Sequence, residues 1–113
     1  MSSESEDEVR GEVVGDRIQL QRGEAAKRPL IQRLNRIEGQ VRGLRKMIEE
    51  DRYCLDEVQQ INAMTAALRE VAMAIIAQHV TAGVKLAADP ETSEDVALAD
   101  VTRVLRAAMR LDT

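Results

Sequence analysis

Aromatic residues are almost absent from this 113-residue sequence, which contains Tyr53 and no Trp or Phe. An all-β sandwich of this size normally uses more aromatic and β-branched side chains, so their scarcity argues against such a fold. Residues that favour helices, such as Ala, Leu, Glu, Arg and Gln, dominate instead. Because a short chain with small aliphatic side chains buries little surface, we expect an oligomer whose subunits share a core.

Long apolar runs and cysteine pairs are missing as well. No apolar run approaches the ~20 residues that a membrane helix needs, and the acidic N-terminus does not resemble a signal peptide. Cys54 is the single cysteine, so no disulfide can form within the chain. We therefore expect a cytoplasmic protein with a reduced thiol and no membrane partner. We expect no enzyme either, because the sequence has no Gly-rich phosphate loop and no third group to orient a Cys–His pair.

Charge is distributed unevenly along the chain. The net charge is -4, and residues 1–16 are strongly acidic. Residues 27–46, by contrast, hold seven Lys or Arg side chains against Glu38 alone. A low isoelectric point does not exclude a nucleic-acid partner when positive charge is concentrated on one element. A solvated helix face would give the same pattern, so charge alone leaves both interpretations open.

The spacing of apolar residues predicts three helices after a disordered acidic tail over residues 1–25. The first helix has Pro29 in its first turn, and the second follows a break at residues 51–53 and runs to about Ala87. The third is capped by Thr92 or Ser93. In the two long helices the apolar positions alternate between spacings of three and four: Leu30, Leu34, Ile37, Val41, Leu44 and Ile48 in the first, and Cys54, Val58, Ile61, Thr65, Leu68, Ala72, Ile75 and His79 in the second.

These stripes predict an all-α subunit over residues 26–113, with two long antiparallel helices and a short third one. An isolated pair of long helices would leave its apolar stripes exposed to water. Pairing two such subunits into a four-helix bundle covers the stripes, and we therefore expect a dimer of this kind.

Cys54 and His79 are the strongest candidate metal ligands. They are 25 positions apart, which is about 20° short of seven full helical turns, so both face the same side of the second helix. About 37 Å of helix axis separates them, so they cannot meet within one straight helix. Two copies packed antiparallel would place Cys54 of one subunit beside His79 of the other, in two identical shared sites. A small core cysteine and a hydrogen-bonded histidine would give the same spacing without any site.

Residues 33–44 read RLNRIEGQVRGL, and residues 47–54 read MIEEDRYC. Together with QINA at residues 60–63 and the later His79, these motifs resemble the CsoR/RcnR family of bacterial metal- and thiol-responsive transcriptional repressors. The resemblance covers about residues 27–110. It implies an all-α homotetramer, a dimer of dimers, that binds operator DNA through basic residues and releases the DNA when an inducer binds.

Candidate DNA-binding residues come from two sources. Arg33 matches a basic residue implicated in DNA binding by the copper sensors of the family. Arg36, Arg42 and Lys46 are added from charge alone.

The sequence most resembles the copper-sensing branch, but it lacks one of the metal ligands of that branch. In that branch Cu(I) lies between a Cys of one subunit and a His and a second Cys of the other. Cys54 and His79 match the first two ligands, and Gly83 stands where the third would be. Tyr53 and Asp100 match residues that support the ligands. The nickel and cobalt, persulfide and formaldehyde branches do not fit either, since they need more histidines, a second cysteine or an N-terminal proline.

The sequence thus predicts a DNA-binding repressor released from operator DNA by an inducer at an inter-subunit site formed by Cys54 and His79. Cu(I) or another soft metal is the expected inducer, because a thiolate and an imidazole alone can bind Cu(I). Three alternatives stay open: a single-cysteine sensor of electrophiles or oxidants, a constitutive DNA-binding protein with a lost metal site, and a purely structural helical bundle.

Overall fold

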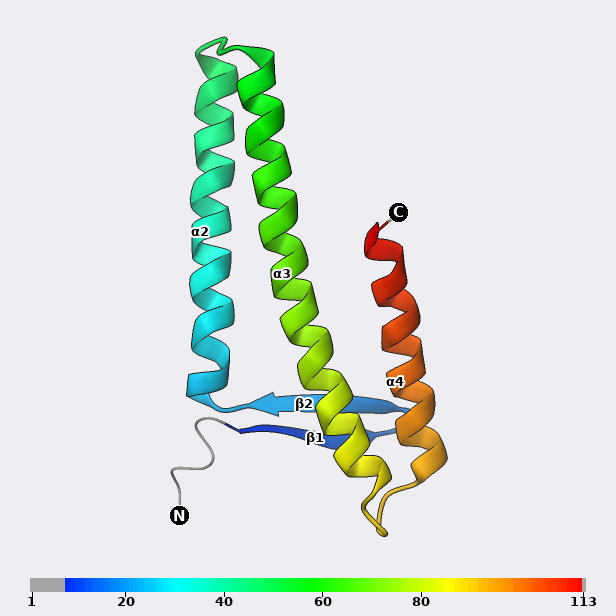
Figure 1. The fold of residues 1–113 in the computed structure, drawn as a ribbon. Helices are drawn as coiled ribbons and strands as arrows, with labels where there is room; N and C mark the ends of the chain where they lie inside the picture. Colours follow the sequence, from blue (N-terminus) through cyan, green and yellow to red (C-terminus); the bar gives the residue numbers. More distant parts are fainter. Residues whose placement is uncertain (1–7, 113) are drawn as a thin grey trace.

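The computed structural model describes residues 8–112 and contains a hairpin followed by three helices. Strands β1 (Val9–Val14) and β2 (Arg17–Arg22) precede α2 (Glu24–Glu49), α3 (Cys54–Ala87), α4 (Glu94–Met109) and the short 3₁₀ turn η1 (Arg110–Asp112). Helices α2 and α3 run antiparallel as a long arm, and α4 packs beside the lower half of α3 (Figure 1). The predicted subunit of two long antiparallel helices and a short third one is confirmed. Within residues 8–112, no helix is long and apolar enough to cross a membrane.

The second and third helices follow the sequence prediction closely. Helix α3 ends at Ala87, as the apolar spacing predicts. The N-cap of α4 is Ser93, whose hydroxyl oxygen accepts a hydrogen bond from the backbone N–H of Val96 at 3.3 Å. Glu94 and Asp95 follow in the first turn, where negative charge offsets the helix dipole.

The first helix begins earlier than predicted. Helix α2 begins at Glu24 after an extended Gly23, so Pro29 lies inside the helix rather than in its first turn. Proline has no N–H to donate to the carbonyl four residues earlier, and its ring crowds that carbonyl. The backbone N–H groups of Ala26 and Lys27 both donate to the carbonyl of Gly23, at 3.1 Å each, which starts the helix ahead of the proline.

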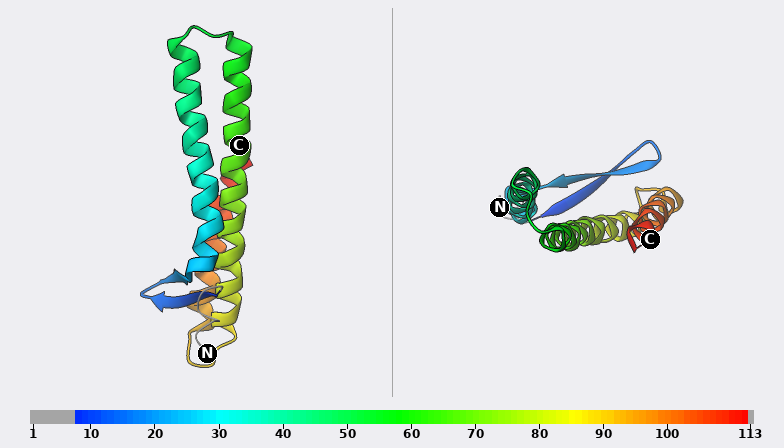
Figure 2. Two further views of the ribbon diagram at one scale, coloured as in Figure 1. Left: turned by 90° about the vertical axis from the view of Figure 1, so that its left-hand side faces the viewer. Right: turned by 90° about the horizontal axis from the view of Figure 1, so that it is seen from above.

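The predicted acidic tail is also wrong for residues 8–25, because most of them form the antiparallel β1–β2 hairpin. This hairpin crosses the lower end of the arm, from the start of α2 to α4 (Figure 2). It adds a small two-stranded sheet to the predicted helical subunit. Residues 1–7 of the predicted tail, and Thr113 at the other end of the chain, lie outside the described residues.

Strict alternation and a tight turn explain why the hairpin forms. In β2, buried Ile18 and half-buried Leu20 alternate with exposed residues, which is the period of a strand with one covered face. The strands are joined by Gly15 and Asp16, and Gly15 has φ 65°. A glycine with positive φ at the first central position is typical of the type II′ turns that join two antiparallel strands.

The hairpin packs its covered face on α3 and α4. Ile18 forms the main buried apolar cluster with Ala97 and Val101 of α4. On β1, a β-carbon at Gly11 would come within 3.0 Å of the side chains of Ala82 and Leu86. The missing side chain of Gly11 therefore lets β1 lie directly on the lower end of α3.

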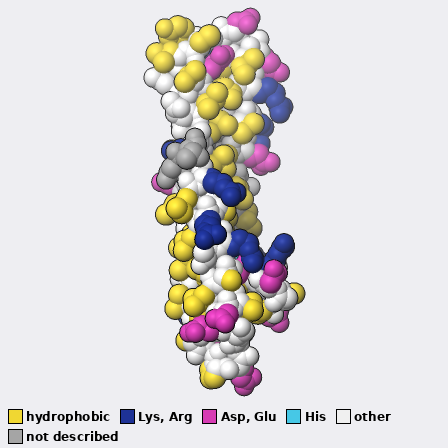
Figure 3. All heavy atoms as spheres, turned by 90° about the vertical axis from the view of Figure 1, so that its right-hand side faces the viewer, with side chains coloured by type: hydrophobic (Ala, Val, Ile, Leu, Met, Phe, Trp, Pro, Cys, Tyr) yellow, Lys and Arg dark blue, Asp and Glu magenta, His cyan; other side chains and the backbone are white. Residues whose placement is uncertain are grey.

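A second apolar surface is left uncovered on the arm. Leu34, Val41 and Ile48 recur every seven residues along α2 and are all exposed in the single chain. Hydrophobic side chains are visible along the upper arm in the space-filling view (Figure 3). A surface of this kind is typical of a helix pair that continues its core into a partner. The exposed apolar members of the matching row on α3 are Val58, Ile61, Leu68 and Ile75.

Gly83 provides a test of how tightly α3 and α4 are packed. A β-carbon at this position would overlap Cγ2 of Val101 and would lie 3.3 Å from Cδ1 of Ile18. We expect Gly83→Ala to lower the free energy of unfolding by about 1–3 kcal/mol, measured by urea denaturation followed by circular dichroism at fixed protein concentration. Gly39→Ala is the matched control, because its new β-carbon would meet only an arginine side chain at 3.5 Å. It should raise the stability by up to ~1 kcal/mol. Equal stability of both variants would contradict the close packing.

Candidate functional site

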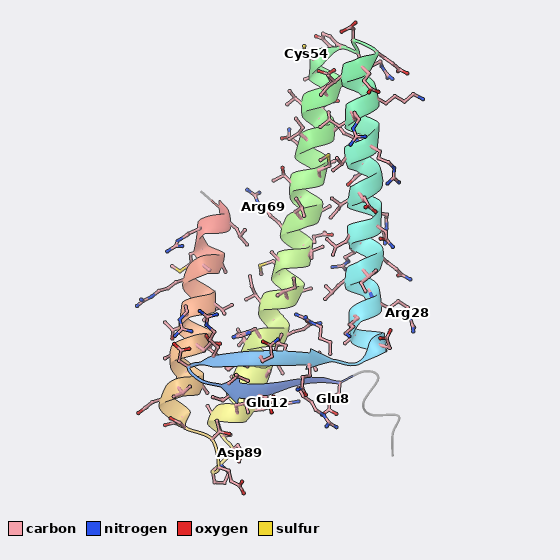
Figure 4. The ribbon with its side chains drawn as sticks, turned by 180° about the vertical axis from the view of Figure 1, so that it is seen from behind. Glu8, Glu12, Arg28, Cys54, Arg69 and Asp89 are labelled. Carbon is pink, nitrogen blue, oxygen red and sulfur yellow. The ribbon has the colours of Figure 1, made fainter. Side chains whose placement is uncertain are left out.

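The two candidate metal ligands lie at opposite ends of α3. Cys54 is the first residue of the helix and is exposed at the tip of the arm (Figure 4). Tyr53 precedes it and is 69% exposed. His79 lies near the other end and is buried. Within residues 8–112, no three His, Cys, Asp or Glu side chains are grouped to hold a metal ion. The candidate site is therefore divided within a single chain, with a cysteine half at Cys54 and a histidine half at His79.

The histidine half is a buried, hydrogen-bonded cluster. His79 and Asp100 are 8% and 4% exposed, and Nε2 of His79 lies 3.0 Å from Oδ2 of Asp100. The same Oδ2 accepts a hydrogen bond from the backbone N–H of Ile18 at 2.9 Å. The other carboxylate oxygen, Oδ1, accepts a hydrogen bond from the guanidinium of Arg103. Three elements thus meet at one carboxylate: β2, α3 and α4.

The chemistry of these partners indicates which nitrogen of His79 carries the proton. A backbone N–H and a guanidinium can only donate, so Asp100 serves as an acceptor at both oxygens. An ionised carboxylate in this position accepts the Nε2–H of His79. In a neutral imidazole the other nitrogen, Nδ1, then carries the lone pair. Among the described residues Nδ1 makes no hydrogen bond, so it can serve as a metal ligand. This arrangement, in which a carboxylate binds the ring nitrogen opposite the metal, is usual for histidine ligands.

The position predicted to lack a third ligand is filled by other side chains. Gly83 lies one turn after His79 on α3 and is buried. The space where its side chain would begin is taken by Val101 of α4, with Ile18 of β2 next to it. A larger residue at position 83 would need α4 or the hairpin to move.

The four basic residues proposed for DNA binding do not share one face of α2. All four are exposed. Arg33 and Arg36 line a shallow groove of about 260 Å³ between α2 and α3, together with Gln40 and Glu70. Arg42 lies nine residues after Arg33, which places it about 180° around the helix, and Lys46 lies on the same outer side as Arg42. The structure thus divides the predicted basic set into two surfaces.

Sequence reasoning missed the contributions of Ile18 and Arg103 to this site. Arg103 also reaches the hairpin turn, where its Nη1 donates to the carbonyl of Asp16 at 3.4 Å. The signal for Ile18 was present, because it stands in an alternating segment directly after a Gly-Asp pair. No local pattern marks Arg103, because its role depends on contacts with residues far away in the sequence.

Comparison with known proteins places these features in a family. The family model described as metal-sensitive transcriptional repressor matches residues 26–107. The copper-sensing transcriptional repressor RicR of Mycobacterium tuberculosis is 55% identical over 49 residues, covering 43% of this chain and 51% of RicR. The chain spans about half the length of the curated relatives it matches.

Two solved structures share the fold over most of the chain. The copper-sensing repressor CsoR with Cu(I) from Geobacillus thermodenitrificans superposes with a TM-score of 0.73 at 31% identity, covering 88% of this chain and 100% of that one. The nickel-responsive transcriptional regulator InrS gives a TM-score of 0.66 at 33% identity, covering 72% of this chain and 90% of that one. With the family model matching most of the chain, these likenesses identify it as a member of the metal-sensitive transcriptional repressor family, the CsoR/RcnR family.

Proposed function

We propose that this protein is a cytoplasmic transcriptional repressor, without enzyme activity, that binds operator DNA and releases it when Cu(I) binds between two subunits. The observation that carries the proposal is the buried His79–Asp100 pair, which leaves Nδ1 of the imidazole available for a metal. Relatives described as copper-sensing repressors support Cu(I) as the inducer.

The proposed site needs a second copy of the chain. The exposed apolar rows of α2 and α3 would be covered if two arms packed antiparallel as a four-helix bundle. That packing brings the exposed thiol of Cys54 in one subunit toward His79 in the other. Tyr53, next to Cys54, and Asp100, behind His79, would support the two ligands. Two such dimers would form the tetramer that the family resemblance implies.

The donor set suits Cu(I), although it is smaller than in the copper sensors that use three ligands. A thiolate is a soft ligand, and a thiolate with an imidazole favours Cu(I) over hard cations. Gly83 cannot supply a third ligand, and the space beside it is filled. The bound ion would therefore keep one position open to an external thiol. Bound Cu(I) would supply a bond between subunits, and that bond can favour one packing of the helices over another.

The DNA surface is proposed to centre on Arg33 and Arg36. Their exposed side chains lie close together beside the groove between α2 and α3, where two phosphates could be contacted. Arg42 and Lys46 face another direction, so they would reach DNA only if it bends around the oligomer or if another subunit presents them.

The copper response can be tested through DNA affinity. We expect one Cu(I) per subunit to weaken binding to the DNA upstream of the protein's own gene at least tenfold, since allosteric coupling typically changes affinity 5- to 150-fold. Fluorescence anisotropy at fixed salt and under reducing conditions measures this change. Cys54→Ser should abolish the response, whereas Met109→Leu, which removes an exposed thioether, should retain it. DNA binding that ignores Cu(I) in the unaltered protein would contradict the proposal and favour a thiol-reactive inducer or a constitutive DNA-binding protein.

The DNA surface can be tested through the salt dependence of binding. Arg33→Ala and Arg36→Ala should each weaken binding to all sequences and should reduce the slope of log affinity against log salt by about 1. The control is Arg17→Ala, which removes an equal charge from the exposed start of β2, beside the hairpin turn. If Arg17→Ala reduces the slope as much as Arg33→Ala does, the proposed surface is wrong. A flat salt response in the unaltered protein would favour a purely structural bundle.

A further inference from the structure

The hairpin lies outside the residues that the family model matches, and yet it is bound to the residues around His79. Arg22 of β2 donates from Nε to the side-chain oxygen of Gln78, the neighbour of His79, at 2.6 Å. At the other end of β2, the backbone N–H of Ile18 donates to Asp100. The hairpin turn is bound to Arg103, the second donor to Asp100. The hairpin thus contacts the histidine half of the site at three points.

Ile18 is the central contact, and the register of the hairpin places it there. Ile18 pairs with Val13, and its N–H is directed away from β1, to the carboxylate of Asp100. Its side chain is buried among Ala97 and Val101 of α4. The backbone and the side chain of Ile18 therefore both hold this residue against α4. The N–H of Ile18 cannot move away from Asp100 unless the apolar cluster opens.

We propose that the β1–β2 hairpin is the positioning element of the sensor histidine. Its Ile18 N–H, together with Arg103, orients the Asp100 carboxylate, and the carboxylate holds His79 with the proton on Nε2 and the lone pair on Nδ1. The inference rests on the proposed role of His79 as a metal ligand. Ile18 and Arg103 are positioning residues, since they act through Asp100.

Water molecules in place of the hairpin would not hold His79 in a single tautomer. With the hairpin detached, Asp100 would lose one donor, and water could reach both the carboxylate and the imidazole. Water can donate or accept at either ring nitrogen, so neither tautomer would be enforced. Loss of partners that orient histidine ligands typically weakens metal binding 10- to 100-fold, which sets the size of the expected effect.

A pair of substitutions at residue 18 separates the backbone donor from the apolar side chain. Ile18→Pro removes the N–H and the side chain, whereas Ile18→Ala keeps the N–H and loses most of the side chain. Arg103→Ala removes the second donor to Asp100. Arg106→Ala is its control, because Arg106 lies one turn further along α4, is exposed and is not a donor to Asp100.

His79 is the only histidine in the sequence, so the imidazole signals in ¹H–¹⁵N nuclear magnetic resonance spectra can be assigned to it without ambiguity. These signals report the tautomer of the ring. The full-length, metal-free protein is measured at a pH where the ring is neutral. Cu(I) affinity is measured separately, by competition with a chromophoric chelator, and circular dichroism checks that each variant is folded.

We expect the Nε2–H tautomer alone in the unaltered protein, in Ile18→Ala and in Arg106→Ala. Ile18→Pro and Arg103→Ala should show both tautomers and should bind Cu(I) at least tenfold more weakly. A single Nε2–H tautomer in both of these folded variants would overturn the inference. Because the tautomer is read without metal, a protein that shows the expected tautomers but does not bind Cu(I) would contradict only the proposed function.

Discussion

The structure depends on one buried carboxylate. Asp100 is 4% exposed, and a charge in such a place is strongly destabilising unless its oxygens are hydrogen-bonded. Its partners come from β2, α3 and α4, through Ile18, His79 and Arg103. Satisfying Asp100 therefore fixes the position of the hairpin relative to both helices. The same hydrogen bonds that hold the lower end of the molecule together also orient the imidazole.

This arrangement divides the proposed sensor into a rigid half and an open half. His79 is fixed within each subunit by Asp100, whereas Cys54 is exposed at the tip of the arm, where the described chain gives it no buried environment. A metal ion that joins a rigid half to an open half can change how two arms pack. The basic side chains of α2 lie on those arms, so a change in packing would alter the spacing of the DNA-binding surfaces.

The helical part of the fold could be predicted because its signals are local and repeated. Alternating spacings of three and four define both long helices, and Ser93 caps α4 as its sequence context predicts. The hairpin was missed because each strand has only six residues and β1 overlaps the acidic segment over residues 1–16. The valines of β1 and the alternating Ile18 and Leu20 of β2 were therefore assigned to the tail. The absence of a third ligand could be predicted from Gly83 in the sequence. Only the structure reveals that Val101 and Ile18 occupy the space where a side chain at position 83 would lie. The role of Arg103 depends on contacts with Asp16 and Asp100 and could not be read from its neighbours.

The central claim is that Cys54 and His79 of different subunits form one site, and mixed oligomers test it most directly. When each variant is measured by itself, neither Cys54→Ser nor His79→Ala should bind Cu(I) at this site. Unfolding and refolding an equal mixture would create heterodimers in which the Cys54 of one subunit meets the His79 of the other. Random pairing predicts recovery of about a quarter of the unaltered Cu(I) capacity, measured by chelator competition. No recovery in mixtures shown to contain heterodimers would contradict the account.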